Sequence, residues 1–187
     1  MIPARGLLAL ALAWPALSLA YGVPELFQAL GQGKPRRAQF VEKKTLALLD
    51  RPVESSGEIS FAPPARLEKR TVKPRPERIV IEGDLATVER GGKTQSFRLT
   101  QQPGIAALVD SIRSTLAGDL DALTRNYSAA VAGDAARWRL TLRPLDPTLS
   151  NIVEHVEIAG SQGVVRTVEI FQADGDRSLM TLSPLEP

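Results

Sequence analysis

The sequence predicts an α+β fold in which a single, highly curved antiparallel sheet forms an unclosed half β-barrel under a helical lid. Two observations predict the sheet: alternating apolar and polar residues recur along most of the chain, and only short connections separate these runs. A third observation predicts the lid, because one helical pattern interrupts the strands near mid-chain. No linker divides the chain and no repeat of about 20–50 residues occurs, so we expect one domain.

The first twenty residues are typical of a secretory signal peptide. Arg5 precedes an apolar run, Gly6–Trp14, and small residues lie just before an expected cleavage after Ala20. The alternative is an N-terminal membrane anchor, but the run is well short of the roughly 20 residues that a membrane-spanning helix needs. We therefore expect a cleaved signal peptide at 1–20 and a soluble, periplasmic domain at 21–187. The absence of cysteine fits that compartment.

The composition excludes several classes of function. The chain has no cysteine and one histidine, His155, which excludes disulfides, cysteine metal sites, thiol nucleophiles and sites that need two imidazoles. The formal net charge of +2 is too small to favour a nucleic-acid partner. No serine stands in a nucleophile elbow, and no glycine loop could cradle a phosphate. We expect no catalytic residue, no metal and no cofactor.

The N-terminal half begins with a short helix and continues with strands. Val23–Leu30 is predicted to be helical, because Pro24 suits a first turn and Gly31 can end the helix. The run Ile79-Val80-Ile81 predicts a strand buried on both faces. Turns rich in proline and glycine separate the strands. The predicted strand ranges are 36–49, 57–61, 66–72, 77–82, 86–88 and 94–100.

The pattern then becomes helical before strands return. Between Pro103 and Gly118, the apolar stripe of an amphipathic helix comprises Ile105, Leu108, Val109, Ile112 and Leu116. A short helix over 119–123 is expected, with Asp119 as its N-cap. Since strand twist makes a large sheet curl, these helices are the elements available to cover its concave face. The later strands are predicted at 127–131, 137–143, 152–158, 164–171 and 178–182.

Basic residues gather within one short stretch of the N-terminal half. Only Glu68 and Glu77 oppose them there. One interpretation is a docking patch for acidic lipid headgroups or for a membrane partner. The alternative is a charged sheet edge that prevents strand-to-strand aggregation. The six basic residues are Arg66, Lys69, Arg70, Lys73, Arg75 and Arg78.

Several short motifs follow one another in a familiar order across residues 24–183. They are Phe40-Val41-Glu42, Gly57-Glu58-Ile59-Ser60-Phe61 with Pro63, Ile79-Val80-Ile81-Glu82-Gly83-Asp84, Leu116-Ala117-Gly118-Asp119, Trp138-Arg139-Leu140-Thr141-Leu142-Arg143-Pro144 and Asp174-Gly175-Asp176 to Met180. In this order the chain resembles the LolA/LolB superfamily of periplasmic lipoprotein carriers, and most closely its LolA-like branch. The resemblance implies an unclosed barrel with a helical lid over a hydrophobic cavity that holds acyl chains.

The resemblance also implies a set of acyl-binding residues. Helix 103–118 is expected to be the lid, with Ile105, Leu108, Ile112 and Leu116 facing the cavity. The same aliphatic side chains could instead fill a solid core, and the sequence does not separate these two alternatives. The full expected set is Phe40, Ile59, Phe61, Leu67, Ile79, Ile81, Phe97, Ile105, Leu108, Ile112, Leu116, Trp138 and Leu140.

The function that this resemblance implies is transport. A monomeric carrier would shuttle an acylated lipoprotein, or another lipid or glycolipid, toward the outer membrane. An inner-membrane exporter would be its donor, and an outer-membrane protein its acceptor. The alternative is a LolA-like sensor or protein-binding domain of an envelope system that transports nothing.

Overall fold

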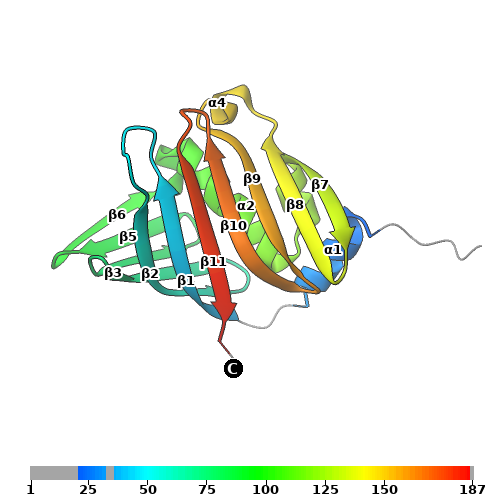
Figure 1. Cartoon of the computed structure of the whole chain (residues 1–187), viewed down its shortest axis with the longest axis horizontal. Coiled ribbons are helices and arrows are strands. Elements are labelled where there is room, and N and C mark those ends of the chain that lie inside the picture. Colours follow the sequence, from blue (N-terminus) through cyan, green and yellow to red (C-terminus); the bar gives the residue numbers. More distant parts are fainter. Residues whose placement is uncertain (1–20, 33–35, 186–187) are drawn as a thin grey trace, which may run out of the picture.

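The computed structural model describes residues 21–32 and 36–185, so the predicted signal peptide lies outside the described residues. The described chain forms two halves made mostly of strands, which a helical segment connects (Figure 1). The first half comprises α1 (Val23–Leu30), β1 (Arg36–Thr45), β2 (Val53–Ala62), β3 (Arg66–Lys73), β4 (Glu77–Glu82), β5 (Leu85–Arg90) and β6 (Lys93–Arg98). The connection comprises η1 (Leu99–Gln101), α2 (Pro103–Ala117) and α3 (Leu120–Thr124). The second half comprises β7 (Tyr127–Asp134), β8 (Arg137–Pro144), α4 (Pro147–Ser150), β9 (Val153–Ser161), β10 (Val164–Gln172) and β11 (Arg177–Pro184).

All strands belong to one antiparallel sheet of 11 strands in the order β6-β5-β4-β3-β2-β1-β11-β10-β9-β8-β7. The first and last strands pair at its centre, where Phe40 lies opposite both Gly57 of β2 and Leu182 of β11. The edge strands β6 and β7 do not pair with each other, so the sheet curls without closing. The predicted fold class, an unclosed antiparallel barrel with a helical cover, is confirmed.

The helices cover the inner face of the sheet. The connection from β6 to β7 carries η1, α2 and α3 across this face, and Figure 1 shows α2 behind the fan of strands. The C-terminal end of α2 lies against α1, and α4 lies at the opposite end of the strands. One face of the sheet is therefore covered and the other is open to solvent.

Two apolar clusters form the core between sheet and helices. The first lies under β7 to β10 together with α1 and α3, and contains the fully buried Trp138, whose indole Nε1 donates to the Gln162 carbonyl at 2.7 Å. The second lies under β2 to β5 and α2, where a row of opposed residues is formed by Phe61, Leu67, Ile81, Ala86 and Phe97. Alternation along each strand turns apolar side chains to this inner face.

The junction of α1 and α2 depends on glycine. Gly118 ends α2 with φ 70°, a left-handed conformation that favours glycine. A Cβ on Gly118 would lie 2.4 Å from the Cα of Gly31, at the end of α1. The two helices therefore meet backbone to backbone. The next helix begins as predicted, because the Asp119 carboxylate accepts a hydrogen bond from the Ala122 N–H at 2.9 Å.

The structure corrects several details of the predicted elements. The strand predicted over 57–61 begins earlier, at Val53, and the strand predicted over 94–100 ends at Arg98, after which the 3-10 helix η1 begins. The first strand ends at Thr45 rather than residue 49, because the Leu49 N–H bonds to the Leu46 carbonyl in a turn. Val80 faces outward and is only partly buried, so β4 is not buried on both faces. The four-residue helix α4 was not predicted. It is too short for a periodic signal, although Asp146 before Pro147 is a typical N-cap pair.

Candidate functional site

The inner face of the N-terminal half gathers most of the expected acyl-binding residues. In the sheet, Phe61, Leu67 and Ile81 are buried in the second cluster. From α2, Ile112 and Leu116 pack against the same cluster. These residues pack against one another between sheet and helix. The other expected members that pack here are Ile59, Ile79 and Phe97.

The remaining expected residues divide between the first cluster and the solvent. Trp138 and Leu140 are fully buried in the first cluster, and Leu108 packs against it. Leu116 contacts both clusters, so α2 bridges the two halves of the core. Ile105 does not face the core as expected, since its side chain is 45% exposed. It belongs to the first turn of α2, where the preceding Gly104 lies against Ile152 beside α4 rather than over the sheet.

The buried side of α2 also carries hydroxyl groups. Ser111, Ser114 and Thr115 are buried. The Ser111 hydroxyl donates to the Leu108 carbonyl at 2.8 Å, and the Thr115 hydroxyl donates to the Ser111 carbonyl at 2.7 Å. These two hydroxyls are thus satisfied within the helix itself. Nearby, burial raises the pKa of Tyr127 to about 12, so this phenol stays neutral.

A charged cluster interrupts the apolar inner face beside Phe40. Glu42 is 5% exposed and accepts hydrogen bonds from Lys69 Nζ at 2.5 Å, Ser178 Oγ at 2.7 Å and Ser55 Oγ at 3.3 Å. The Lys69 ammonium also lies 4.8 Å from the centre of the Phe40 ring, a cation–π distance. Phe40 is thus buried as expected, but it packs beneath a charge. We call Glu42, Lys69, Ser55 and Ser178 the inner charged cluster.

The carboxylate of this cluster is ionised at neutral pH. Burial alone would raise the pKa of Glu42, but the Lys69 ammonium and the hydrogen bonds from Lys69 and Ser178 outweigh it. The pKa of Glu42 therefore lies below its ordinary value. Lys44 adds a second positive charge, with its Nζ 3.6 Å from Glu42 Oε1.

The six basic residues predicted as a docking patch do not share one face. Lys69 was expected among them, but strand alternation places it on the inner face with Leu67 and Thr71, while Arg66 and Arg70 point outward. Because side chains alternate between the two faces along a strand, the sequence alone already indicates that Lys69 lies on the face opposite to Arg66 and Arg70. Lys73 and Arg75 lie at the exposed turn between β3 and β4.

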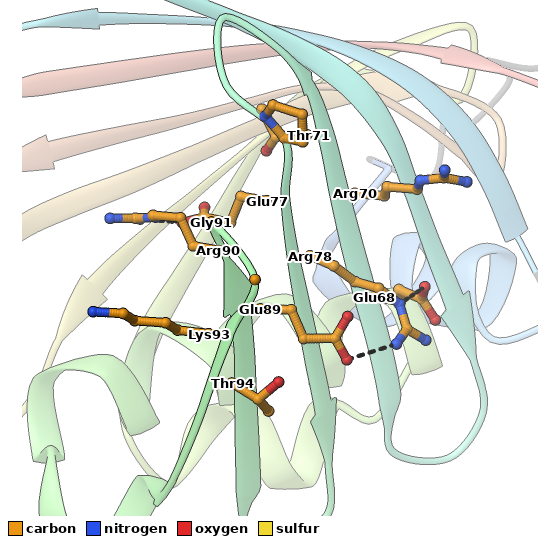
Figure 2. Close-up of a pocket in the computed structure, with 12 residues that line it drawn as sticks. Glu68, Arg70, Thr71, Glu77, Arg78, Glu89, Arg90, Gly91, Lys93 and Thr94 are labelled. Carbon is orange, nitrogen blue, oxygen red and sulfur yellow. Dashed lines mark hydrogen bonds and ion pairs between the residues drawn. The ribbon is translucent and has the colours of Figure 1, made fainter.

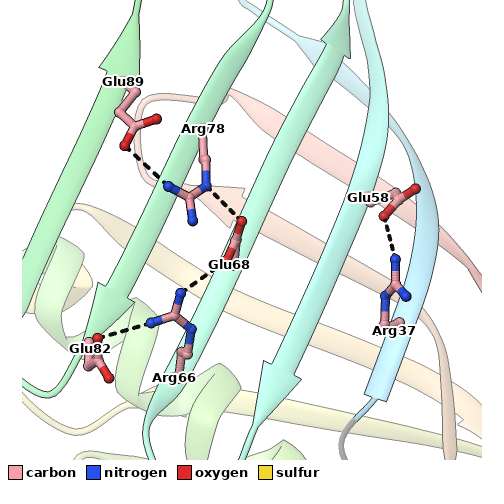
Figure 3. Close-up of polar contacts among 7 residues, drawn as sticks. All are labelled: Arg37, Glu58, Arg66, Glu68, Arg78, Glu82 and Glu89. Carbon is pink, nitrogen blue, oxygen red and sulfur yellow. Dashed lines mark hydrogen bonds and ion pairs between the residues drawn. The ribbon is translucent and has the colours of Figure 1, made fainter. Parts of the chain in front are cut away.

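On the outer face, two of these arginines are neutralised by carboxylates. Arg78 donates to Glu68 at 2.7 Å and to Glu89 at 3.2 Å, while Arg66 donates to Glu68 at 3.3 Å and to Glu82 at 3.0 Å (Figure 3). Hydrogen bonds from Arg78 and Arg66 hold the pKa of Glu68 below its ordinary value despite partial burial. This continuous ladder supports the alternative of a charge-balanced sheet surface for these two residues.

Shallow grooves flank this ladder. One of about 460 Å³ crosses the ends of β3 to β6, and another of about 250 Å³ lies over β1 to β3. Figure 2 shows Arg90 and Lys93 pointing away from the Arg78–Glu89 pair across the larger groove. Arg70 lines both grooves and forms no ion pair with any described residue. Charged side chains line both grooves, and neither groove is the enclosed apolar cavity that the family resemblance implies.

The described residues offer little for metal chemistry. They contain no group of three histidine, aspartate or glutamate side chains that could hold a metal ion. His155 stacks on Phe171 with ring centroids 4.1 Å apart on the outer face. Among the elements given above, no helix is long and apolar enough to cross a membrane.

Comparison with known proteins gives one family-level match. A family model described as "Outer membrane lipoprotein carrier protein LolA-like" matches residues 16–183. A curated relative from Dechloromonas aromatica (strain RCB), named "Outer-membrane lipoprotein carrier protein", is 25% identical over 177 residues, which cover 92% of this chain and 80% of the relative.

Solved structures with a related arrangement are more distant. The LolA superfamily protein NE2245 from Nitrosomonas europaea has a TM-score of 0.46 and 11% identity, covering 88% of this chain and 92% of that chain. The MucA/MucB complex of Pseudomonas aeruginosa includes a chain with a TM-score of 0.44 and 14% identity, covering 87% of this chain and 56% of that chain.

Proposed function

Because the chain belongs to the family of LolA-like outer membrane lipoprotein carrier proteins, we propose that it is a periplasmic carrier. It binds an acyl chain between the inner face of its sheet and α2, and shuttles an acylated lipoprotein, or another lipid or glycolipid, toward the outer membrane. The observation that carries this proposal is the apolar row Phe61, Leu67, Ile81, which is covered by one helix rather than by a second sheet.

The energy of the cargo explains why a carrier is needed. Exposing an acyl chain to water costs about 0.8 kcal/mol per methylene, so a sixteen-carbon chain faces a barrier of about 12 kcal/mol. A carrier offsets this cost by burying the chain, and must still release it. A helix that covers the chain in one conformation and exposes it in another provides both properties, because the two conformations bind the chain with different affinity.

The contacts of α2 are suited to such an opening. Its apolar side chains pack against the sheet without directional bonds, and two of its three buried hydroxyls bond to carbonyls of α2 itself. Among the described residues, the side chains of α2 make one hydrogen bond to the strand region, from Arg113 Nη2 to the Gly83 carbonyl at 2.8 Å. Moving α2 away therefore breaks few polar bonds. The acyl chain then takes the place of Ile112 and Leu116 against the sheet.

A disulfide that locks α2 tests the proposal directly. A Cβ on Gly104 would lie 3.8 Å from the Cβ of Ile152, which matches the mean Cβ–Cβ separation of about 3.8 Å in disulfides. The chain has no cysteine of its own, so Gly104→Cys with Ile152→Cys introduces the only thiols. We expect the oxidised double variant to bind a fluorescent acyl probe at least about tenfold more slowly than the wild type, because α2 cannot move.

The same protein serves as its own control. Reduction with dithiothreitol should restore the wild-type rate of probe binding, and each single cysteine variant should bind like the wild type under both conditions. Equal binding rates for the oxidised and reduced double variant would show that α2 is not the lid. Absence of probe binding in the wild type itself would contradict acyl carriage altogether.

The partners follow from the proposed route. A carrier of this kind takes its cargo from an inner-membrane exporter and delivers it to an outer-membrane acceptor. Since Arg66 and Arg78 are paired with carboxylates, we propose that a partner contacts only the remaining exposed basic residues of the predicted patch, which are Arg70 and, at the β3–β4 turn, Lys73 and Arg75. A protein-binding sensor without cargo remains the alternative, and the probe-binding experiment separates it from a carrier.

A further inference from the structure

The inner charged cluster lies inside the surface proposed to bind the acyl chain. Lys69 stands directly opposite Ile59 on β2 and Ile79 on β4, and its ammonium faces the Phe40 ring. All three neighbours belong to the expected acyl-binding set. A charge at this position is costly unless it is paired, and it is not needed to fill an apolar core.

The two charges of the cluster differ in their remaining capacity for hydrogen bonds. Both carboxylate oxygens of Glu42 are already engaged, Oε2 by Lys69 and Ser55 and Oε1 by Ser178. Lys69 has three N–H donors, and the described residues accept only one of them. Its side chain is 21% exposed, so the other donors can be reached from solvent. The hydrogen-bonding groups of the two charges that remain without a partner among the described residues are therefore N–H donors of Lys69.

The charge balance points the same way. Glu42 is flanked by Lys69 and by Lys44, so one carboxylate faces two ammonium groups. Along the inner side of the neighbouring strand ends, Glu77 is paired with Arg90. Together with Lys44, the cluster thus carries a net positive charge at one edge of the apolar surface, and binding of an oxyanion there would be favourable.

The apolar row lies two positions from Lys69 along β3, toward the start of the strand. Lys69 and Leu67 are two positions apart on β3, with Glu68 between them, which corresponds to about 6.6 Å along a strand. Leu67 belongs to the row that includes Phe61 and Ile81. A polar head bound at Lys69 would therefore lead directly into the surface proposed for the chain.

We propose that Lys69 binds the oxyanion of an acidic acyl lipid, a carboxylate or a phosphate, whose hydrocarbon chain lies along Phe61, Leu67 and Ile81. This inference rests on the proposed carrier function and adds a headgroup preference to it. Ser55 and Ser178 hold the Glu42 carboxylate, which in turn accepts from the Lys69 ammonium, and the centre of the Phe40 ring lies 4.8 Å from that ammonium.

Competition binding with matched lipids tests the preference. Unlabelled lipids displace a neutral fluorescent acyl ester at pH 8, where oleic acid is ionised. Oleic acid is compared with methyl oleate, and oleoyl-lysophosphatidic acid with mono-oleoylglycerol, so that each pair differs in its charged group. We expect at least one acidic lipid to bind about tenfold more tightly than its neutral counterpart, the size of one charge-assisted hydrogen bond. The pair with the larger ratio identifies carboxylate or phosphate as the ligand.

Variants assign the preference to Lys69. Lys69→Met combined with Glu42→Gln removes both charges together, so that no charge is left buried without its partner. This double variant should bind acidic and neutral lipids equally, while Lys69→Arg should keep the preference. Lys43→Met is the matched control, because Lys43 is the neighbouring lysine that faces outward and pairs with Glu54 at 3.1 Å. It should behave like the wild type.

The outcomes separate the two proposals. Equal affinity of the wild type for both members of each pair overturns the headgroup site but leaves acyl carriage intact. A preference that survives in the Lys69→Met/Glu42→Gln variant overturns the assignment to Lys69. Failure of every lipid to displace the ester, or failure of the ester itself to bind, contradicts the carrier function and the headgroup site together.

Discussion

Glu42 shows at the level of a single residue how the inner face tolerates charge. Three hydrogen bonds and the Lys69 ammonium offset the cost of burying its carboxylate, and its pKa lies below the ordinary value. A carboxylate with a lowered pKa stabilises the folded state above the pKa it has in the unfolded chain. That contribution is lost as the pH falls through the pKa of the folded state.

Replacing this carboxylate should therefore have an effect that depends on pH. Glu42→Gln leaves Lys69 without its counter-ion, and we expect it to lower the free energy of unfolding by about 2 kcal/mol at pH 7. The difference from the wild type should stay constant from pH 7 down to about 4.3, the ordinary pKa of a glutamate, and shrink only at lower pH, because the wild-type carboxylate is protonated only as the pH falls through its lowered pKa in the folded state. Urea unfolding at several pH values measures both effects.

The control for this variant is an exposed carboxylate. Glu54→Gln removes the charge of a side chain that is 61% exposed and paired with Lys43, so it should change stability by less than about 0.5 kcal/mol at any of these pH values. A Glu42→Gln effect that stayed constant even well below a pH of about 4.3 would show that the lost interaction does not depend on ionisation.

At the level of residues, the sequence predicted only some of the contacts of the inner charged cluster. Alternation along β3 was visible in the sequence, yet proximity in the chain led to Lys69 being grouped with Arg66 and Arg70. The pairing of Glu42 with Lys69, 27 positions later, depends on the register of three strands. A register follows from the packing of the whole sheet and is not contained in any single strand.

At the level of elements, the meeting point of α1 and α2 is the most constrained contact of the cover. Gly118→Ala should lower the free energy of unfolding by about 3 kcal/mol, because it combines a left-handed backbone with a clash against Gly31. Thermal unfolding followed by circular dichroism measures the loss.

A second glycine isolates the packing contribution. Gly91 has φ 58°, similar to Gly118, but a Cβ there would meet nothing within 4 Å. Gly91→Ala should therefore cost only about 1 kcal/mol, the backbone contribution alone. Equal losses for the two variants would show that the α1–α2 contact adds no stability.

The helices and strands were largely predictable, because the sequence patterns that predict each of them lie within the element itself. The ranges of β3, β4 and β8 agree with the sequence pattern to within one residue, and Pro103 and Gly118 delimit α2 as expected. The exposed Ile105 was not predictable, because its position in the apolar stripe is correct for a helix. Only the placement of α2, whose first turn lies beside α4, leaves this side chain in solvent.

At the level of the whole molecule, the order of the strands explains the open shape. Pairing of β1 with β11 joins the first and last strands of the described residues at the centre of the sheet and leaves β6 and β7 as free edges. The connection between those edges must cross the inner face, which is why α2 covers the core. The sequence predicted one curled sheet with a helical cover, but an apolar cavity could not be separated from a filled core. In the structure, Ile112 and Leu116 of α2 pack against the inner face of the sheet.

The central claim is that this protein carries an acyl lipid beneath α2. Native mass spectrometry of protein taken directly from the periplasm, without exposure to added lipid or detergent, tests it most directly. The account predicts a population with one bound mass of lipid size, which collisional activation releases and fragmentation identifies by its acyl chains. A protein that is uniformly free of bound lipid, and that does not take up an acyl probe afterwards, would contradict it.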